Sequence, residues 1–252
     1  SDELKSGMME LLVVRPISIV QLVWAKFLGA LVVVLLAVLP TLVYLWSVHV
    51  LGSPVGNLDW GAAIGSFIGL IALGAAYTAV AVFASSLTTN NVVAFVLGVA
   101  FNMGLYLGFE ALADLYKFSG WELTVRNFGI NEHYRSMSRG VIDARDLGYF
   151  ISLVLLFIGA TVAVIGRPHL KAPWRKAFVY MVGAVALLVL TFTVRFRFDL
   201  TEEQRFSLSE GTASLLEQVE EPLLVKVFLS GEFPAGFERL QRETQHQLEE
   251  WS

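Results

Sequence analysis

The sequence predicts an all-α polytopic membrane protein with five transmembrane helices, followed by the beginning of an extracytoplasmic α/β domain. Two observations carry this prediction: the long apolar stretches in the first 197 residues, and an abrupt change of charge after them. A bilayer core about 30 Å thick is crossed by about 20 apolar residues in a helix, and only helices or closed barrels satisfy every backbone group there. These continuous stretches lack the alternation of barrel strands. They are Val20–Val48, Gly61–Leu87, Val92–Ala113, Leu147–Gly166 and Ala177–Val194.

The charge distribution divides the chain near residue 198. The whole chain is 56% hydrophobic and 16% charged, with a net charge of −4. Residues 1–198 carry 14 basic and 10 acidic side chains, whereas residues 199–252 carry 4 and 12. Such a shift indicates a change from bilayer to water. In the acidic part we expect a helix over Ser209–Val219, a strand over Pro222–Leu229 and a helix over Phe237–Trp251, too few elements to bury a core of their own.

A short amphipathic helix is expected before the first span. Leu4, Met8, Leu11 and Leu12 share one helical face, and charged residues occupy much of the rest of Asp2–Val14. This pattern is typical of a helix lying on a membrane surface. It leaves open whether a partner protein binds there.

Local signals mark the entry into the first span. Arg15 precedes Pro16 and ends the surface helix, because the residue before a proline avoids helical geometry. Ser18, with Gln21 three residues later, forms a capping box that starts the next helix. Pro40 lies inside the span and is expected to kink it.

Small residues predict close packing between the second and third spans. Gly61, Gly65 and Gly69 occupy every fourth position of the second span, and Gly104 and Gly108 repeat this spacing in the third. Stripes of small residues let helix backbones approach closely. We therefore expect these two helices to pack against each other through the five glycines.

Two polar residues of the third span are candidates for a transport pathway. Asn102 lies near mid-membrane, where an amide either contacts a substrate or hydrogen-bonds a neighbouring helix. Glu110 lies near the end of the span, where a carboxylate either takes part in transport or reaches water or an arginine. Farther on, Gly129 begins a turn into a short helix. Glu132 and His133 on that helix do not predict a metal site, because neighbours in sequence point apart on a helix.

The basic residues predict the orientation in the membrane. The connection Leu51–Trp60 has no Lys or Arg, whereas Arg167–Lys176 has four. Basic connections favour the cytoplasmic side. The N-terminal segment and the turn Thr88–Asn91 are therefore expected in the cytoplasm, and Asp114–Asp146 and residues 198–252 outside it.

The sequence does not predict an enzyme. It has no cysteine, four scattered histidines and no G-x-x-x-x-G-K-[ST] phosphate loop. We expect no cofactor, no metal and no nucleic-acid partner. No charge lies deep inside a span, which favours energy supplied by another subunit.

The first 28 residues resemble the signature of ABC-2-type permeases. In that family an E-x-K-x-G-T-x-E-L-L-x-x-x-P-x-S run precedes a transmembrane helix, and Met8 stands here where the family has Thr. The resemblance implies an ATPase-coupling helix on the inner face, with Glu3, Lys5, Gly7 and Glu10 at motif positions and Arg15, at the corner that follows, as a further site residue. It also implies a separate ABC ATPase subunit and a second permease copy as partners, with the whole in contact with membrane lipid.

Longer motifs resemble the gliding-motility-associated ABC permease, the Gld F-type subunit. They include the run G-I-N-E-H-Y-R-S-M-S-R-G-V-I-D-A-R-D over Gly129–Asp146. Arg197–Ser209 and Gly231–Leu240 resemble instead the start of the Gld G-type accessory subunit. The resemblance implies two polypeptides joined in one, either by natural fusion or because adjacent reading frames were joined. Since the sequence starts without Met and stops within a helical pattern, we expect it to be part of a longer protein.

The expected domains follow from these motifs. Residues 1–166 are expected to form a partial ABC-2-type permease domain, residues 167–176 a basic cytoplasmic linker, residues 177–197 the transmembrane anchor of the accessory subunit, and residues 198–252 the start of its outer domain.

The function that the resemblance implies is that of a permease subunit of an ABC-2-type transporter, gliding-motility or secretion associated, in a bacterial inner (plasma) membrane. A non-transporting membrane scaffold for an envelope machine is the main alternative. An enzyme acting on lipid-linked substrates is the weakest one.

Overall fold

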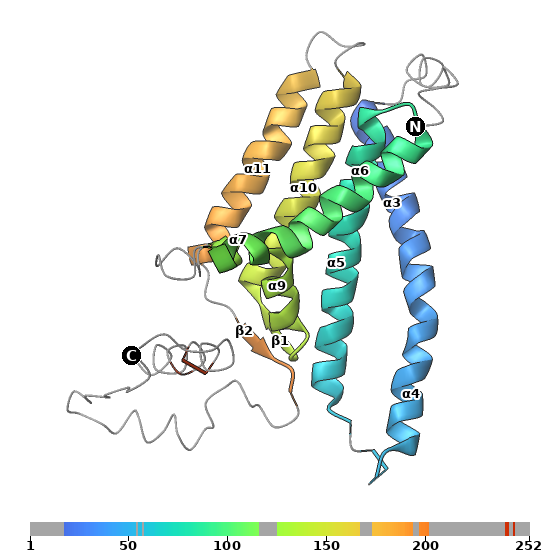
Figure 1. The fold of residues 1–252 in the computed structure, drawn as a ribbon, viewed down its shortest axis with the longest axis vertical. Coiled ribbons are helices and arrows are strands. Elements are labelled where there is room, and N and C mark those ends of the chain that lie inside the picture. Colours follow the sequence, from blue (N-terminus) through green and yellow to red (C-terminus); the bar gives the residue numbers. More distant parts are fainter. Residues whose placement is uncertain are drawn as a thin grey trace, which may run out of the picture. The chain divides into compact units, whose positions relative to one another are not determined.

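The computed structural model describes residues 18–53, 55–56, 58–115, 125–166, 173–193, 197–201, 240–241 and 244. The chain divides into two compact units, residues 1–205 and 206–252. The elements of the first unit (Figure 1) are α3 (Ile19–Val38), the 3-10 turn η1 (Leu39–Thr41), α4 (Leu42–Leu51), α5 (Trp60–Leu87), α6 (Asn91–Met103), the π-helical segment η2 (Gly104–Gly108), α7 (Phe109–Leu115), α9 (Ile130–Met137), β1 (Val141–Asp143), α10 (Ala144–Gly166), α11 (Pro173–Thr193) and β2 (Arg197–Asp199).

Several expected elements lie outside the described residues. The surface helix Asp2–Val14 is one of them, and so are the helix over Ser209–Val219 and the strand over Pro222–Leu229. Within the helix expected over Phe237–Trp251, the described positions 240, 241 and 244 are helical.

The first span is a helix with one interruption. Its start is the expected capping box: the Gln21 N–H donates to Ser18 Oγ at 3.2 Å, and the Ser18 N–H donates to Gln21 Oε1 at 2.9 Å. At Pro40 the α-helix gives way to the 3-10 turn η1, because proline has no N–H to donate. The interruption expected at Pro40 is confirmed in this form. With α3 and α4 on either side, the helical run covers Ile19–Leu51.

Among the residues that the structure describes, four helical runs are long and apolar enough to cross a membrane: Ile19–Leu51, Trp60–Leu87, Asn91–Leu115 and Ala144–Gly166. They correspond to the first four expected spans. The fifth expected span corresponds to α11, a helix of 21 residues, and its passage through the membrane stays a prediction. α11 begins at Pro173, so its first turn occupies part of the stretch expected to be a linker over residues 167–176.

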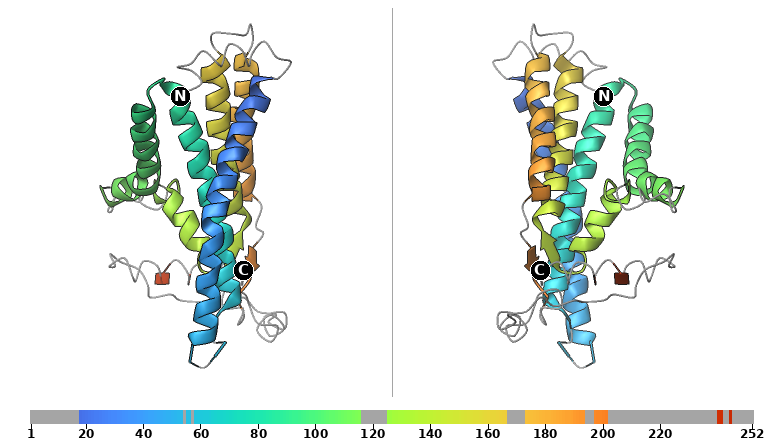
Figure 2. Two further views of the ribbon diagram at one scale, coloured as in Figure 1. Left: turned by 90° about the vertical axis from the view of Figure 1, so that its right-hand side faces the viewer. Right: turned by 90° about the vertical axis from the view of Figure 1, so that its left-hand side faces the viewer.

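The third span bends at its π-helical segment. The chain changes direction between α6 and α7 (Figure 2), where η2 replaces α-helical hydrogen bonding over Gly104–Gly108. Single π-helical turns inside α-helices are a recognised cause of bends and occur often at functional sites.

Helix α10 is the centre of the described helices. It lies between α5 and α11 (Figure 1) and also contacts α3. Gly148 allows the close approach of α11, because a Cβ at this position would lie 2.0 Å from Thr191 Cγ2. Trp24 of α3 also reaches α11, since its Nε1–H donates to the Tyr180 hydroxyl at 3.1 Å. Thus α11 packs as an integral member of the same unit as α3 and α10.

The glycine stripe of α5 has a different partner from the expected one. A Cβ at Gly61 would lie 1.5 Å from the Leu200 carbonyl oxygen, and one at Gly65 would lie 2.7 Å from Gly140 Cα. A Cβ at Gly69 would lie 3.1 Å from Met137 Cβ. The stripe therefore receives the segment around α9 and β2, and not α6.

The two glycines expected on the other side of that contact are not packed at all. A Cβ at Gly104 or at Gly108 would have nothing within 4 Å among the described residues. The α5–α6 contact uses Gly98 instead, whose Cβ would lie 3.8 Å from Ala84 Cβ. The expectation of a five-glycine contact between these helices was wrong. A stripe of small residues shows only that something packs closely against it, and the sequence does not show whether that is a helix or a loop.

Two short strands connect distant parts of the chain. β1 and β2 pair antiparallel, with Val141 opposite Asp199, Ile142 opposite Phe198 and Asp143 opposite Arg197. β1 follows α9 directly, and β2 comes just after α11. The pairing therefore returns the end of the first unit to the segment between the third and fourth spans.

Candidate functional site

The candidate functional site is built around α9, the short helix between the third and fourth spans. The turn and short helix expected from Gly129 onward are confirmed as α9, Ile130–Met137. Ile130 and Met137 are fully buried and pack with Ala76 of α5 and Tyr149 of α10. The polar side chains of α9 contact the ends of the neighbouring helices. We call α9 together with residues 125–129 and 138–143 the α9 segment.

Glu110 connects α7 to α9. Its Oε2 accepts a hydrogen bond from Asn131 Nδ2 at 2.8 Å, and its Oε1 lies 3.5 Å from Arg135 Nη2. Arg126 Nη2, which also belongs to the α9 segment, lies 3.5 Å from Asp114 Oδ1. Asp114 is largely exposed, so this second pair contributes little to stability. Of the two roles considered for Glu110, the structure shows the one in which the carboxylate reaches an arginine.

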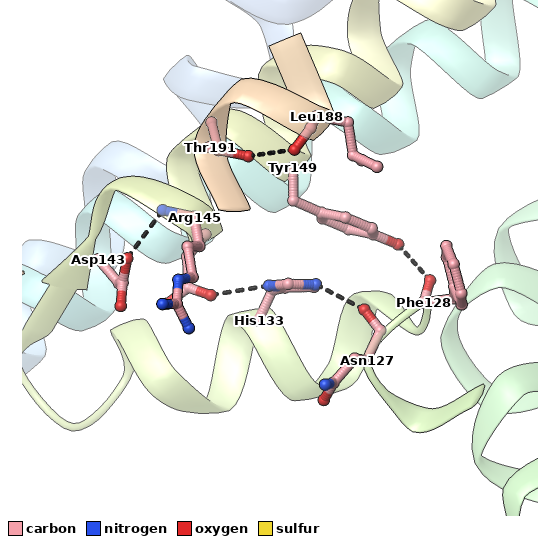
Figure 3. A network of polar contacts seen from close by, with 9 residues as sticks. Asn127, Phe128, His133, Asp143, Arg145, Tyr149, Leu188 and Thr191 are labelled. Carbon is pink, nitrogen blue, oxygen red and sulfur yellow. Dashed lines mark hydrogen bonds and ion pairs between the residues drawn. The ribbon is translucent and has the colours of Figure 1, made fainter. Parts of the chain in front are cut away.

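His133 connects α9 to the first turn of α10 (Figure 3). Its Nδ1 lies 2.7 Å from Asp146 Oδ1, and its Nε2 lies 2.8 Å from the Asn127 carbonyl oxygen. The imidazole stacks on the Tyr149 ring with 3.9 Å between centroids, and the Tyr149 hydroxyl donates to the Phe128 carbonyl at 2.7 Å. The turn before α9 is thus held to α10 by two side chains stacked on one another.

The hydrogen-bond partners of His133 define where protons must lie. A carbonyl oxygen can only accept, so Nε2 must carry a proton. The contact with Asp146 then requires a second proton, either on Nδ1 or on the carboxyl group. Both side chains are largely buried, 14% and 8% exposed. The pair has no net charge in either arrangement; with the proton on Nδ1 both groups are charged, and their mutual attraction then offsets part of the cost of burying them.

Three buried side-chain oxygens lack a hydrogen bond within the described part of the chain. They are Asp146 Oδ2, next to His133, Ser152 Oγ of α10, and Asn102 Oδ1, in the last turns of α6 before the π-helical segment. A buried oxygen without a donor is costly in a folded protein. Of the two roles left open for Asn102, a hydrogen bond to a neighbouring helix is not seen for this oxygen among the described residues.

Of the other expected site residues, five lie outside the described residues, and the three glycines of α5 lie against the α9 segment and Leu200. Glu3, Lys5, Gly7, Glu10 and Arg15 precede the first described residue. Gly61, Gly65 and Gly69 do take part in the site, because they receive residues of the α9 segment and Leu200.

The sequence did not identify the pairing of His133 with Asp146. They are thirteen positions apart in the chain, with a turn and a strand between them. The polar residues of this short helix, next to a membrane span, indicate that it makes polar contacts. Their spacing in the sequence does not show which residues are the partners. Among the described residues, no group of three or more His, Asp or Glu could hold a metal ion.

A partly open apolar groove lies between α3, α5 and α10. It has a volume of about 290 Å³ and is lined by side chains of α3, α5 and α10, including Trp24, Ala75 and Phe150. Since Trp24 gives its one polar hydrogen to Tyr180, the walls offer no polar partner that would hold water.

These features define the class of protein: a polytopic helical membrane protein whose membrane helices are joined at one end by a polar segment. Residues 1–126, half of the chain, match the model of the ABC-2 family transporter proteins. The chain belongs to this family, and is a transmembrane permease of an ABC transporter, a transport component that is not itself catalytic. Residues 202–252 match a domain of unknown function, DUF7088. Neither a curated protein nor a solved structure matches the chain.

Proposed function

We propose that this chain is the permease subunit of a transporter that a separate ABC ATPase subunit energises from the cytoplasmic face. The observation that carries the proposal is the ABC-2 family match over residues 1–126, which covers three helical runs long enough to cross a membrane. ATP hydrolysis must reach such a permease through a cytoplasmic element. The amphipathic stretch Asp2–Val14 is the best candidate, because it lies within the family match and leads through Arg15 and Pro16 into the capped start of α3.

The surface helix would present two different faces. Its leucines and Met8 would rest on the membrane helices, while Glu3, Lys5 and Glu10 would face the ATPase. Charged groups at such an interface give orientation and specificity more than affinity. Gly7 would permit close approach.

The proposal extends to the second part of the chain. The basic stretch 167–176 would lie in the cytoplasm, α11 would cross the membrane, and residues 198–252 would lie outside the cytoplasm of a bacterial cell, in its inner membrane. The packing of α11 on α10 supports a fifth transmembrane helix. The resemblance to Gld F-type and Gld G-type subunits supports a role in gliding motility or in secretion linked to it.

A second permease copy is the remaining proposed partner. Large apolar side chains on α3, α4 and α6 are exposed, among them Val33, Tyr44, Trp46 and Phe95. In a membrane these faces would contact lipid or a second copy. Asn102 would lie along the pathway between copies, and Glu110 would hold the end of α7 in place.

The coupling role is tested by reversing two charges of the surface helix. We expect Glu3→Lys combined with Glu10→Lys to reduce co-purification of the ATPase subunit about tenfold and to uncouple hydrolysis from transport, since both substitutions reverse the charge that orients the partner. The measurement is recovery of the ATPase with the full-length permease from solubilised membranes, together with transport-linked ATP hydrolysis.

The matched control is Glu202→Lys combined with Glu203→Lys. It reverses the same number of charges in the segment that we propose to lie outside the cytoplasm. It should leave ATPase recovery unchanged. Equal recovery and equal activity with both double variants would reject the coupling role and would favour the scaffold. Membrane insertion is checked for each variant by extraction with carbonate.

A further inference from the structure

Strand β2 and the two residues after it lie in a groove made by three other elements. β1 pairs with one edge of the strand, and the Leu200 N–H donates to the Gly140 carbonyl at 2.9 Å. Thr201 is 4% exposed. It donates its N–H to Asp199 Oδ1 at 2.9 Å, and its hydroxyl donates to the same oxygen. The segment 197–201 therefore ends in a fixed turn and not in a free tail.

Glycines make the groove deep enough for this strand. At Gly61 a Cβ would lie 1.5 Å from the Leu200 carbonyl oxygen, a distance that no side chain allows. Gly140 has φ +88°, a backbone conformation that favours glycine, and its Cβ would lie 3.0 Å from Thr201 Cγ2. Gly65 accepts Gly140 in the same way. The floor of the groove is thus the first turns of α5, and its wall is the turn between α9 and β1.

Ser66 adds a polar attachment beneath the strand pair. Its hydroxyl lies within hydrogen-bond distance of two carbonyl oxygens, that of Ala62 in α5 at 2.8 Å and that of Ser138 at 2.9 Å. Its one hydrogen is shared between them, so α5 also contacts the turn that carries β1. A pair of strands of three residues each is only marginally stable by itself in water. Here the pair is supported by a helix, and this support makes a stable docking place for an extended segment.

The position of the groove in the chain gives it a role. The docked segment ends at Thr201, and the second family match begins at residue 202. We propose that the Gly61–Gly65–Gly140 groove is a docking site for the strand 197–201, and that this strand attaches residues 202–252 to the first turns of α5. Without it, residues 202–252 would be attached through the end of α11 alone. With it, their point of attachment is fixed to the first turns of α5 and to the α9 segment.

The attachment is measured as a distance distribution between two spin labels. Because the chain has no cysteine, Ile64→Cys on α5 and Glu203→Cys give two specific labelling sites in the full chain reconstituted in nanodiscs. Ile64 is 50% exposed, so its label does not disturb packing. We expect a narrow distribution for this pair.

The test variant is Gly61→Val, and the matched control is Gly104→Val, at a glycine with open space around it. Valine at position 61 must displace Leu200, so the distribution should broaden at least twofold. Valine at position 104 should leave it narrow. The proposal would be overturned if the distance distribution had the same width with Gly61→Val as without it. It would also be overturned if the distribution were already broad in the doubly labelled protein that keeps Gly61.

A second variant decides the question if Gly61→Val does not insert into membranes. Ile142→Cys with Phe198→Cys introduces thiols at directly opposed positions of the strand pair, within reach of a disulfide. We expect most molecules to form it under mild oxidation, whereas Val92→Cys with Phe198→Cys should not. Failure of the first pair to cross-link would overturn the docking. None of these measurements involves the ATPase. Their outcome is therefore independent of the test of the proposed transport function.

Discussion

At the scale of single residues, His133 shows how one side chain fixes several parts of the chain at once. Its ring nitrogens contact Asp146 and the Asn127 carbonyl, and its face lies on Tyr149. Removing a buried partner leaves the other group without compensation, and this costs more than the net value of the pair. The substitutions that keep or remove a charge at these positions should therefore differ strongly.

We expect His133→Phe to lower the free energy of unfolding by roughly 3–5 kcal/mol, because it keeps the stacking but leaves the Asp146 carboxyl group buried without its partner. Asp146→Asn should cost much less, since an amide can donate to Nδ1 while Nε2–H still reaches Asn127. The measurement is denaturant unfolding in detergent micelles.

The double variant provides the control for this prediction. Asp146→Leu in the His133→Phe background removes the stranded carboxyl group, so it should restore part of the lost stability. If His133→Phe were no more destabilising than Asp146→Asn, the His133–Asp146 pair would not be the feature that stabilises the α9 segment.

At the scale of elements, the glycine stripe of α5 determines how the α9 segment lies. Gly65 accepts the backbone of Gly140, and Gly69 accepts Met137. Backbone atoms cannot move aside as the tip of a flexible side chain can. A larger residue in the stripe must therefore displace the turn between α9 and β1.

We expect Gly65→Leu to lower stability by roughly 1–3 kcal/mol through overpacking. Gly104→Leu is the control, because it adds the same side chain to a helix position with open space around it. The midpoints of thermal unfolding of the two variants are compared in the same detergent. A drop of equal size in both would mean that leucine acts through the bilayer-facing surface and not through the α9 segment.

At the scale of the whole molecule, the basic residues predict the orientation of the chain in the membrane. Arg167–Lys176 carries four Lys or Arg, and Leu51–Trp60 carries none. We expect Glu203→Cys to react with a membrane-impermeant thiol reagent in intact cells, and Lys171→Cys to react only after the membrane is opened. The natural absence of cysteine keeps the background low. Labelling of the cysteine at position 171 but not of the one at position 203 would show that the orientation is the opposite of the predicted one.

Much of the fold could be predicted because its signals are local. The apolar runs gave the four described spans, and the start of α3 follows from Ser18 and Gln21, which are three residues apart. Pro40 disturbs its helix through its own missing N–H. Each of these features depends on neighbouring residues and on the length of a run, and both are visible in the sequence.

The candidate site could be predicted only in part. The helix from Ile130 and the arginine contact of Glu110 were among the expectations. The partner of the glycine stripe was not, and neither was the pairing of β1 with β2, whose residues are more than fifty positions apart in the chain. Strands of three residues carry too little periodicity to be recognised.

The sequence by itself determined that this chain resides in a membrane, where its first four membrane helices lie, and to which family it belongs, because burial in lipid demands long apolar helices whatever their neighbours are. Tertiary structure alone decided what those helices touch. A glycine in the sequence indicates that another segment can approach closely, but it does not show which segment. A histidine can pair with any carboxyl group that the fold places next to it. The groove of Gly61, Gly65 and Gly140 exists because β2 and the turn after α9 lie against the first turns of α5, and the pair of His133 with Asp146 exists because α9 lies against the first turn of α10.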